Sequence, residues 1–206
     1  MTKALNKRPR RYLRSRITRK LILDTALNVF LQEGYAKTTV AKISEQANVG
    51  YGTVYSHYKG KDDILKKVVD SILEDFFILL DVEFAPQNYR EAREIFHNLM
   101  LTCFRLADQH RPLMKVFQEA LGQSESICSY WQGVMEHYTT NAFNSICYAQ
   151  EKGLAKNFDP RMGAKAYILL IERFIWEVVN ENEKDLEYLS TFLTDMVFQG
   201  FFNPPV

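Results

Sequence analysis

Residues 38–61, TTVAKISEQANVGYGTVYSHYKGK, decide the fold of this chain. In the first half, Val40, Ile43 and Ala47 stand at i, i+3 and i+7, which is one face of a helix. Asn48 follows where that helix must end, because asparagine tolerates the left-handed backbone of a sharp turn. The second half repeats an apolar face at i and i+4. Two short helices joined by a tight turn form a helix-turn-helix, whose second helix can enter the major groove of DNA.

A wider set of residues at fixed spacing gives this stretch a family resemblance. The set is Gly34-Tyr35, Thr38-Thr39-Val40, Ile43, Ala47-Asn48-Val49, Gly52-Thr53-Val54-Tyr55, His57-Tyr58 and Lys61. In type and spacing it resembles the N-terminal domain of the TetR (tetracycline repressor) family of bacterial transcription regulators. The resembling block spans roughly residues 17–73, and the rest of the chain agrees with the family only in length and helical character. One departure is Gly50, because many family members have Ser or another small polar residue there, which would cap the second helix.

The resemblance implies which residues contact DNA. Thr39 opens the first helix of the motif, where a threonine can cap the helix and the free amides favour a phosphate. Tyr51 lies at the N-terminus of the expected recognition helix, residues 51–57, which is the end that probes the groove. Tyr55 and Lys61 match the family's phosphate-binding tyrosine and lysine. The expected DNA contacts are Thr39, Gly50, Tyr51, Gly52, Thr53, Tyr55, Ser56, His57, Lys61, Arg8, Arg10 and Arg11.

Three of these assignments have plain alternatives. Tyr55 has the alternative role of a partly buried core aromatic. His57 has that of a surface residue without a base contact. The basic residues before position 15 either follow the DNA backbone and minor groove or add only general electrostatic attraction.

Charge is divided unevenly along the chain, whose net charge is +1. Residues 1–61 carry 13 Lys or Arg and 3 Asp or Glu, whereas residues 62–206 carry 13 and 22. A basic N-terminal part on an acidic remainder is typical of nucleic-acid binding confined to one end. Residues 1–14 lack acidic side chains and contain Pro9, which interrupts a helix, so we expect a disordered basic arm there.

The rest of the chain also reads as helix, which predicts an all-α protein. We expect a basic disordered arm at residues 1–14, a three-helix helix-turn-helix DNA-binding domain at 15–61, and a helical ligand-binding and dimerisation domain at 62–206. The last two helices, expected at 160–180 and 184–202, carry more apolar surface than one core-facing side requires. This surplus predicts a homodimer formed through these two helices, the arrangement that the family uses.

A small-molecule site is expected in the C-terminal domain. Its helices carry aromatic and methionine side chains with a few polar groups, the usual lining of such a site. The candidate ligand-binding residues are Phe96, Met100, Phe104, Phe117, Tyr130, Trp131, Met135, Tyr138, Phe174 and Glu172. The alternative for each is an ordinary core residue, since aromatics at helical spacing usually pack in the core. We expect a small hydrophobic or aromatic effector; a cationic lipophile balanced by a buried Glu is a narrower variant that the sequence alone does not favour.

Catalytic and metal sites have little support in the sequence. The four histidines have no partner at metal-ligand spacing, and no phosphate-binding glycine loop or nucleophile elbow occurs. We therefore expect no enzyme, no cofactor and no metal. The three cysteines lack CxxC spacing and suit a reducing cytoplasm, and no apolar run is long enough for a membrane span.

The expected function is that of a dimeric repressor on a pseudo-palindromic double-stranded DNA operator, released by its effector. In this scheme the ligand displaces the fourth helix, expected at residues 62–81, and alters the separation of the two recognition helices. The alternatives are a transcriptional activator, a sequence-tolerant DNA-binding protein and a cytosolic lipophile-binding protein.

Overall fold

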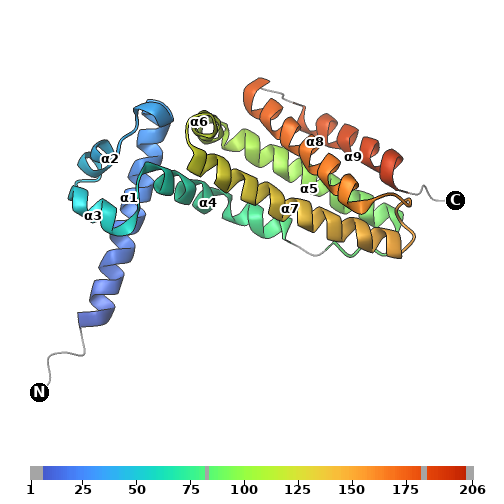
Figure 1. The fold of residues 1–206 in the computed structure, drawn as a ribbon, viewed down its shortest axis with the longest axis horizontal. Coiled ribbons are helices and arrows are strands. Elements are labelled where there is room, and N and C mark those ends of the chain that lie inside the picture. The colour runs from blue at the N-terminus through green and yellow to red at the C-terminus, as the bar shows by residue number, and fades with distance from the viewer. Residues whose placement is uncertain (1–6, 82–83, 182–184, 203–206) are drawn as a thin grey trace, which may run out of the picture. The chain divides into compact units, whose positions relative to one another are not determined.

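The computed structural model describes residues 7–81, 84–181 and 185–202, which are helical almost throughout (Figure 1). The helices are α1 (Lys7–Lys37), α2 (Val40–Gln46), α3 (Tyr51–His57), α4 (Lys61–Leu80), α5 (Tyr89–Gln109), α6 (Arg111–Leu121), α7 (Glu125–Glu151), α8 (Pro160–Glu181) and α9 (Leu186–Phe201). The described ranges hold no strand, only an isolated bridge between Ala155 and Phe202. The predicted all-α fold class is confirmed.

The chain forms two compact units. The first unit consists of residues 1–72 and 116–128, and the second of residues 73–115 and 129–206. The first unit therefore contains α1 to α3, the start of α4, the end of α6 and the start of α7. The sequence reading placed residues 62–72 and 116–128 with the C-terminal domain, whereas here they pack with the helix-turn-helix.

The core of the first unit forms around one face of α1. Ile22, Ala26 and Phe30 are completely buried on this face, at the i, i+4 and i+8 spacing of one side of a helix. Ile43 of α2 and Val54 of α3 are also completely buried. Because α2 packs on α1 and α3 packs on α2, α3 is held as the outermost helix of the motif.

Helix α1 differs from the prediction at its start. It begins at Lys7 rather than Ser15, so the described part of the expected disordered arm, residues 7–14, is helical. Pro9 is accommodated because it lies in the first turn, where backbone N–H groups have no partner within the helix. Residues 1–6 lie outside the described residues. At the other end the regular helix stops at Gly34, whose φ of 75° and ψ of 177° form a backbone conformation that favours glycine.

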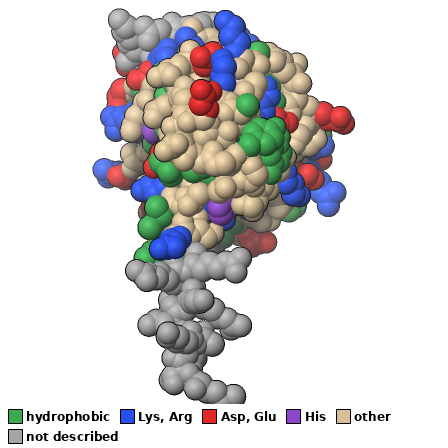
Figure 2. All heavy atoms as spheres, turned by 90° about the vertical axis from the view of Figure 1, so that its left-hand side faces the viewer, with side chains coloured by type: hydrophobic (Ala, Val, Ile, Leu, Met, Phe, Trp, Pro, Cys, Tyr) green, Lys and Arg blue, Asp and Glu red, His purple; other side chains and the backbone are tan. Residues whose placement is uncertain are grey.

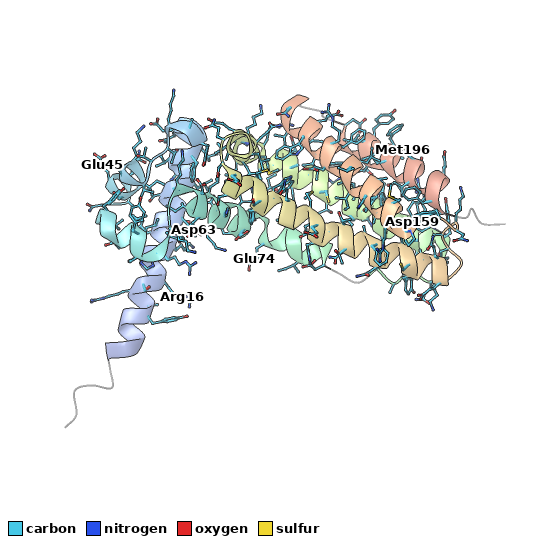
Figure 3. The ribbon with its side chains drawn as sticks, viewed as in Figure 1. Arg16, Glu45, Asp63, Glu74, Asp159 and Met196 are labelled. Carbon is cyan, nitrogen blue, oxygen red and sulfur yellow. The ribbon has the colours of Figure 1, made fainter. Side chains whose placement is uncertain are left out.

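In the second unit, α5 packs against α8 and α9. Phe198 of α9 is buried here. The centroid of its ring lies 5.7 Å from that of Phe96, and the ring stacks on Phe202 with centroids 4.0 Å apart. At the N-terminus of α8 the Asp159 carboxylate (Figure 3) accepts a hydrogen bond from the Arg161 amide at 2.9 Å. These packed helices leave a cavity between them, described below.

Candidate DNA-binding surface and ligand cavity

Thr39 caps α2 as the sequence predicted. Its hydroxyl accepts a hydrogen bond from the Lys42 amide at 3.2 Å, and its φ of −131° is extended. Thr39 is exposed, whereas its neighbour Thr38 is buried and donates to the Gly34 carbonyl at 2.6 Å. Thr39 therefore combines a cap with an accessible hydroxyl at a helix N-terminus, a position that suits a phosphate.

The turn between α2 and α3 has the expected backbone. Asn48 has a φ of 50°, the one non-glycine residue with positive φ among the described residues. Gly50 stands at the N-cap of α3 and provides no side-chain cap. The cap that many family members have is therefore missing here, and α3 starts with uncapped amides.

Helix α3 exposes nearly all of its side chains. Val54 is its one buried residue, while Tyr51 is 52% and Tyr55 46% exposed. The two tyrosine rings form an edge-on pair with centroids 4.9 Å apart, and their hydroxyls lie within 3.2 Å. Tyr55 is thus not a core aromatic. Figure 2 shows the side of the molecule that carries α2 and α3, where Lys and Arg side chains are interspersed with Asp and Glu.

The other predicted contacts on α3 differ in availability. Gly52 and Thr53 are exposed, so both are accessible to a partner. Ser56 is also exposed, but its hydroxyl donates to the Thr53 carbonyl at 2.7 Å. His57 is half-buried, with its ring 6.3 Å from that of Tyr58.

Lys61 is oriented toward the protein. Its ammonium group donates to the Tyr35 carbonyl at 3.0 Å and lies 4.0 Å from the centroid of the Tyr35 ring. A phosphate contact requires it to leave these two partners or to share them. Of the predicted arginines, Arg8, Arg10 and Arg11 lie in the first turns of α1.

Sequence reasoning missed a carboxylate that holds the junction of α1 and α2. Glu119 of α6 accepts hydrogen bonds from the amides of Tyr35 at 2.8 Å and Ala36 at 3.1 Å; we call this the Glu119 bridge. The bond from the Tyr35 amide is the main reason that the pKa of Glu119 is below its usual value. Glu119 lies in the first unit and does not line the cavity described below.

A second polar contact supports the same junction. The Tyr35 hydroxyl donates to Asp62 at 2.6 Å, and the Ser124 hydroxyl donates to the other oxygen of Asp62 at 2.5 Å. Burial, followed by the bond to Asp62, raises the pKa of Tyr35 to about 12. These partners are far apart in sequence, so no local pattern could have revealed them.

The second unit contains a cavity of about 430 Å³ between α5, α7 and α8. Six of the predicted ligand residues line it: Phe96, Met100, Trp131, Met135, Tyr138 and Glu172. The rest of the lining is mainly aliphatic, and a few polar side chains that the sequence reading did not select take part: Asn98, Thr102, Asn141 and Ser145. Asn141 and Ser145 continue the α7 face of Tyr138 at helical spacing, which is the signal that could have found them.

Four predicted ligand residues do not line the cavity. Phe104 is completely buried in the core of the second unit. Phe117 is completely buried as well, but it belongs to the first unit. Tyr130 and Phe174 each lie next to a lining position, and one step along a helix turns a side chain by about 100° away from that face.

One corner of the cavity is polar. The Trp131 indole N–H donates to a Glu172 carboxylate oxygen at 2.5 Å, and the Trp131 ring lies 5.8 Å from the Trp176 ring. Cys103 also lines the cavity, and burial raises its pKa to about 12, so its thiol stays protonated. In the described residues no group of three or more His, Cys, Asp or Glu side chains is arranged to hold a metal ion.

Helices α8 and α9 expose large apolar side chains. Met162 and Leu169 of α8 are 62% and 65% exposed, at i and i+7. On α9, Tyr188, Phe192 and Met196 are exposed at i, i+4 and i+8. Figure 3 labels Met196 on this helix. Both helices therefore expose large apolar side chains, which on α8 share a face with the exposed Lys165 and Arg173. Within the described ranges, no helix has the length and apolar character that a membrane crossing requires.

Comparisons with known proteins agree on the class of protein. Residues 22–68 match the model of the bacterial regulatory proteins, tetR family. The chain is 27% identical over 168 residues to the uncharacterized HTH-type transcriptional regulator YhgD of Bacillus subtilis (strain 168). The aligned region covers 77% of this chain and 84% of YhgD. It is 25% identical over 190 residues to the fatty acid metabolism regulator protein of the same organism, covering 88% and 94% of the two chains.

A solved structure shows the same fold. The complex of SmeT with triclosan aligns with 91% of this chain and 92% of its own, with a TM-score of 0.72 and 21% sequence identity. SmeT is the repressor of the Stenotrophomonas maltophilia multidrug efflux pump SmeDEF. The likeness establishes an N-terminal helix-turn-helix followed by a helical domain in this chain.

Proposed function

This chain belongs to the TetR family of helix-turn-helix transcriptional regulators, and from that premise we propose that it is a dimeric repressor. It binds a pseudo-palindromic operator and is released by a small hydrophobic or aromatic effector held in the cavity of the second unit. The observation that carries the proposal is α3, a helix inside the matched residues whose side chains are nearly all exposed.

The DNA contacts divide into two groups. Tyr51 and Thr53 are exposed toward the N-terminal end of α3, the end that meets base edges in a helix-turn-helix complex. Thr39, Tyr55 and the basic start of α1 supply phosphate contacts, which fix the register without reading sequence. Lys61 joins this second group when it exchanges its Tyr35 partners for a phosphate.

Dimerisation through α8 and α9 is supported by their exposed apolar sides. Two such helices from each of two copies can form a four-helix interface, which removes these side chains from water. A two-fold dimer matches a palindromic operator when its recognition helices enter major grooves about 34–36 Å apart, or a multiple of this distance.

In this proposal, release of the protein from its operator depends on two helices that contribute residues to both units. Helix α4 contributes Lys61–Ile72 to the first unit and Leu73–Leu80 to the second. Helix α6 carries Met114, which lines the cavity, five residues before Glu119, which holds the amides of Tyr35 and Ala36. An effector that displaces α4 or α6 changes the separation of the recognition helices, and it must bind the DNA-incompetent state better.

The deciding experiment is fluorescence anisotropy with the duplex upstream of the protein's own gene and a scrambled duplex, over a salt series. We expect the specific duplex to bind about 10³-fold or more tightly. Equal affinities with a steep salt dependence, on fragments selected genome-wide as well, would favour a sequence-tolerant DNA-binding protein. Transcription in vitro from the operator separates a repressor from an activator.

A further inference from the structure

The charge of the cavity wall indicates which class of effector it takes, an inference that rests on the proposed function of the cavity as an effector site. Among the described lining residues, Glu172 carries a charge and none is Lys, Arg or His. Glu172 is half-buried, and one of its oxygens accepts the neutral Trp131 N–H at 2.5 Å. The Trp131 indole is a neutral donor, so it brings no positive charge to this half-buried carboxylate, and a cationic partner is favoured there.

Aromatic rings complete the surroundings of this carboxylate. Trp131 lies beside Glu172 and packs against Trp176 at 5.8 Å, while Tyr138 and Tyr167 line the wall. Burial raises the pKa of both tyrosines, so their rings stay uncharged. The face of an aromatic ring attracts a cation, most strongly in the case of tryptophan.

We propose that the effector is a lipophilic cation whose ammonium head lies against Glu172 and the Trp131 ring and whose apolar body fills the cavity. The lining of the cavity is mainly aliphatic and aromatic, so the apolar body can pack there without burying many polar groups. A lipophilic carboxylate instead meets Glu172, and the described part of the lining contains no Lys, Arg or His to neutralise either charge. An uncharged lipophile fills the same volume but gains nothing from the carboxylate.

The chain provides its own probe for the test. It has two tryptophans, Trp131 and Trp176, which are the pair at this corner, so tryptophan emission reports on the proposed head-group site. The full-length protein is titrated with decyltrimethylammonium, decan-1-ol and decanoate below their micelle concentrations. We expect decyltrimethylammonium to bind at least about tenfold more tightly than the other two.

Two glutamine variants assign the preference to one carboxylate. Glu172→Gln should weaken decyltrimethylammonium about tenfold and leave decan-1-ol unchanged, because it removes the charge and keeps the shape. Glu177→Gln is the matched control on the same helix, since Glu177 pairs with Arg173 at 2.9 Å and does not line the cavity; it should change neither.

The inference is overturned if decanoate or decan-1-ol binds as tightly as the cation, if Glu172→Gln has no effect, or if none of the three changes the emission. Operator affinity is measured in the same samples to separate this result from the proposed function. Specific operator binding without a preference for the cation removes only the inference. Absence of specific binding to any selected fragment removes the proposed function, whatever the emission shows.

Discussion

Helix α3 and the cavity wall use tyrosine in opposite surroundings. Tyr51 and Tyr55 are 52% and 46% exposed on α3, whereas Tyr138 in the cavity wall is 8% exposed. The exposed pair offers two hydroxyls to an outside partner. The buried side chain offers mainly ring surface, and burial raises its pKa well above the ordinary value. A residue type therefore indicates little about its partner until its exposure is known.

The largest expected effect concerns the division between cavity wall and core. Phe104 is completely buried and does not line the cavity, so Phe104→Ala removes packed core volume. We expect the free energy of unfolding to fall by about 3–5 kcal/mol. Met135 lines the cavity and is half-buried, so Met135→Ala should cost less than half as much. Urea unfolding followed by circular dichroism compares them, and equal losses would remove the distinction between wall and core.

The next effect concerns the basic start of the chain. Residues 1–14 contain six Lys or Arg, and each phosphate contact contributes about 0.9 to the slope of log K against log salt. Deleting these residues should lower that slope by up to about 5 and weaken operator and scrambled DNA alike. Anisotropy over a salt series measures it, with Lys115→Gln, an exposed charge on α6, as the control. An unchanged slope would mean that the arm does not contact DNA.

Substitutions on α3 should distinguish the residue that contacts bases from the residue that contacts a phosphate. Tyr51→Ala should reduce the difference in binding free energy between the specific and the scrambled duplex by about 1–3 kcal/mol, because Tyr51 is proposed to contact base edges. Tyr55→Phe should weaken both duplexes equally and by about 1 kcal/mol, because it removes one hydroxyl. The reverse pattern in anisotropy would exchange the two roles. The hydroxyls lie within 3.2 Å, so the double variant shows whether they act together.

The Glu119 bridge should have a smaller effect, on the first unit alone. Glu119→Ala removes the acceptor of two backbone amides, and because water can reach the site we expect a loss of about 1 kcal/mol. Hydrogen exchange at Tyr35 and Ala36 should quicken. Glu119→Gln should restore part of the protection, and Gln118→Ala, one position earlier, should leave it intact. Unchanged exchange in Glu119→Ala would show that other contacts hold the junction.

The smallest effect is the pH dependence of the same bridge. The folded pKa of Glu119 is below its ordinary value of 4.5, chiefly because the Tyr35 amide donates to it. The unfolded chain thus binds more protons, so the stabilisation is complete above pH 4.5 and is lost as pH falls through the lowered pKa. The difference in unfolding free energy between the native protein and Glu119→Ala should shrink accordingly. A difference that stays constant in acid would contradict this origin of the shift.

The helix-turn-helix could be predicted because its determinants are local. Thr39 caps α2 and Asn48 adopts a positive φ, each where the sequence placed it. The start of α1 was wrong because Pro9 was taken as a helix breaker, although in a first turn it costs no hydrogen bond.

The cavity could be predicted only in part, because void space depends on several helices together. Met100 and Phe104 share a helix face at i and i+4, and both are buried, yet only Met100 borders the cavity. Spacing along one helix cannot distinguish such neighbours. The Glu119 bridge was missed for a similar reason, since 84 residues separate Glu119 from Tyr35.

The single buried side chain of α3 has a consequence for how such a regulator changes over generations. Val54 is the one buried side chain of α3 and His57 is half-buried, so replacing the exposed Tyr51, Thr53 or Ser56 removes little packing. A duplicated copy can therefore drift toward a new target sequence without losing its fold, and a laboratory library confined to these three positions should yield mostly folded variants. In this molecule, the positions proposed to determine the DNA target are also positions that contribute little to folding.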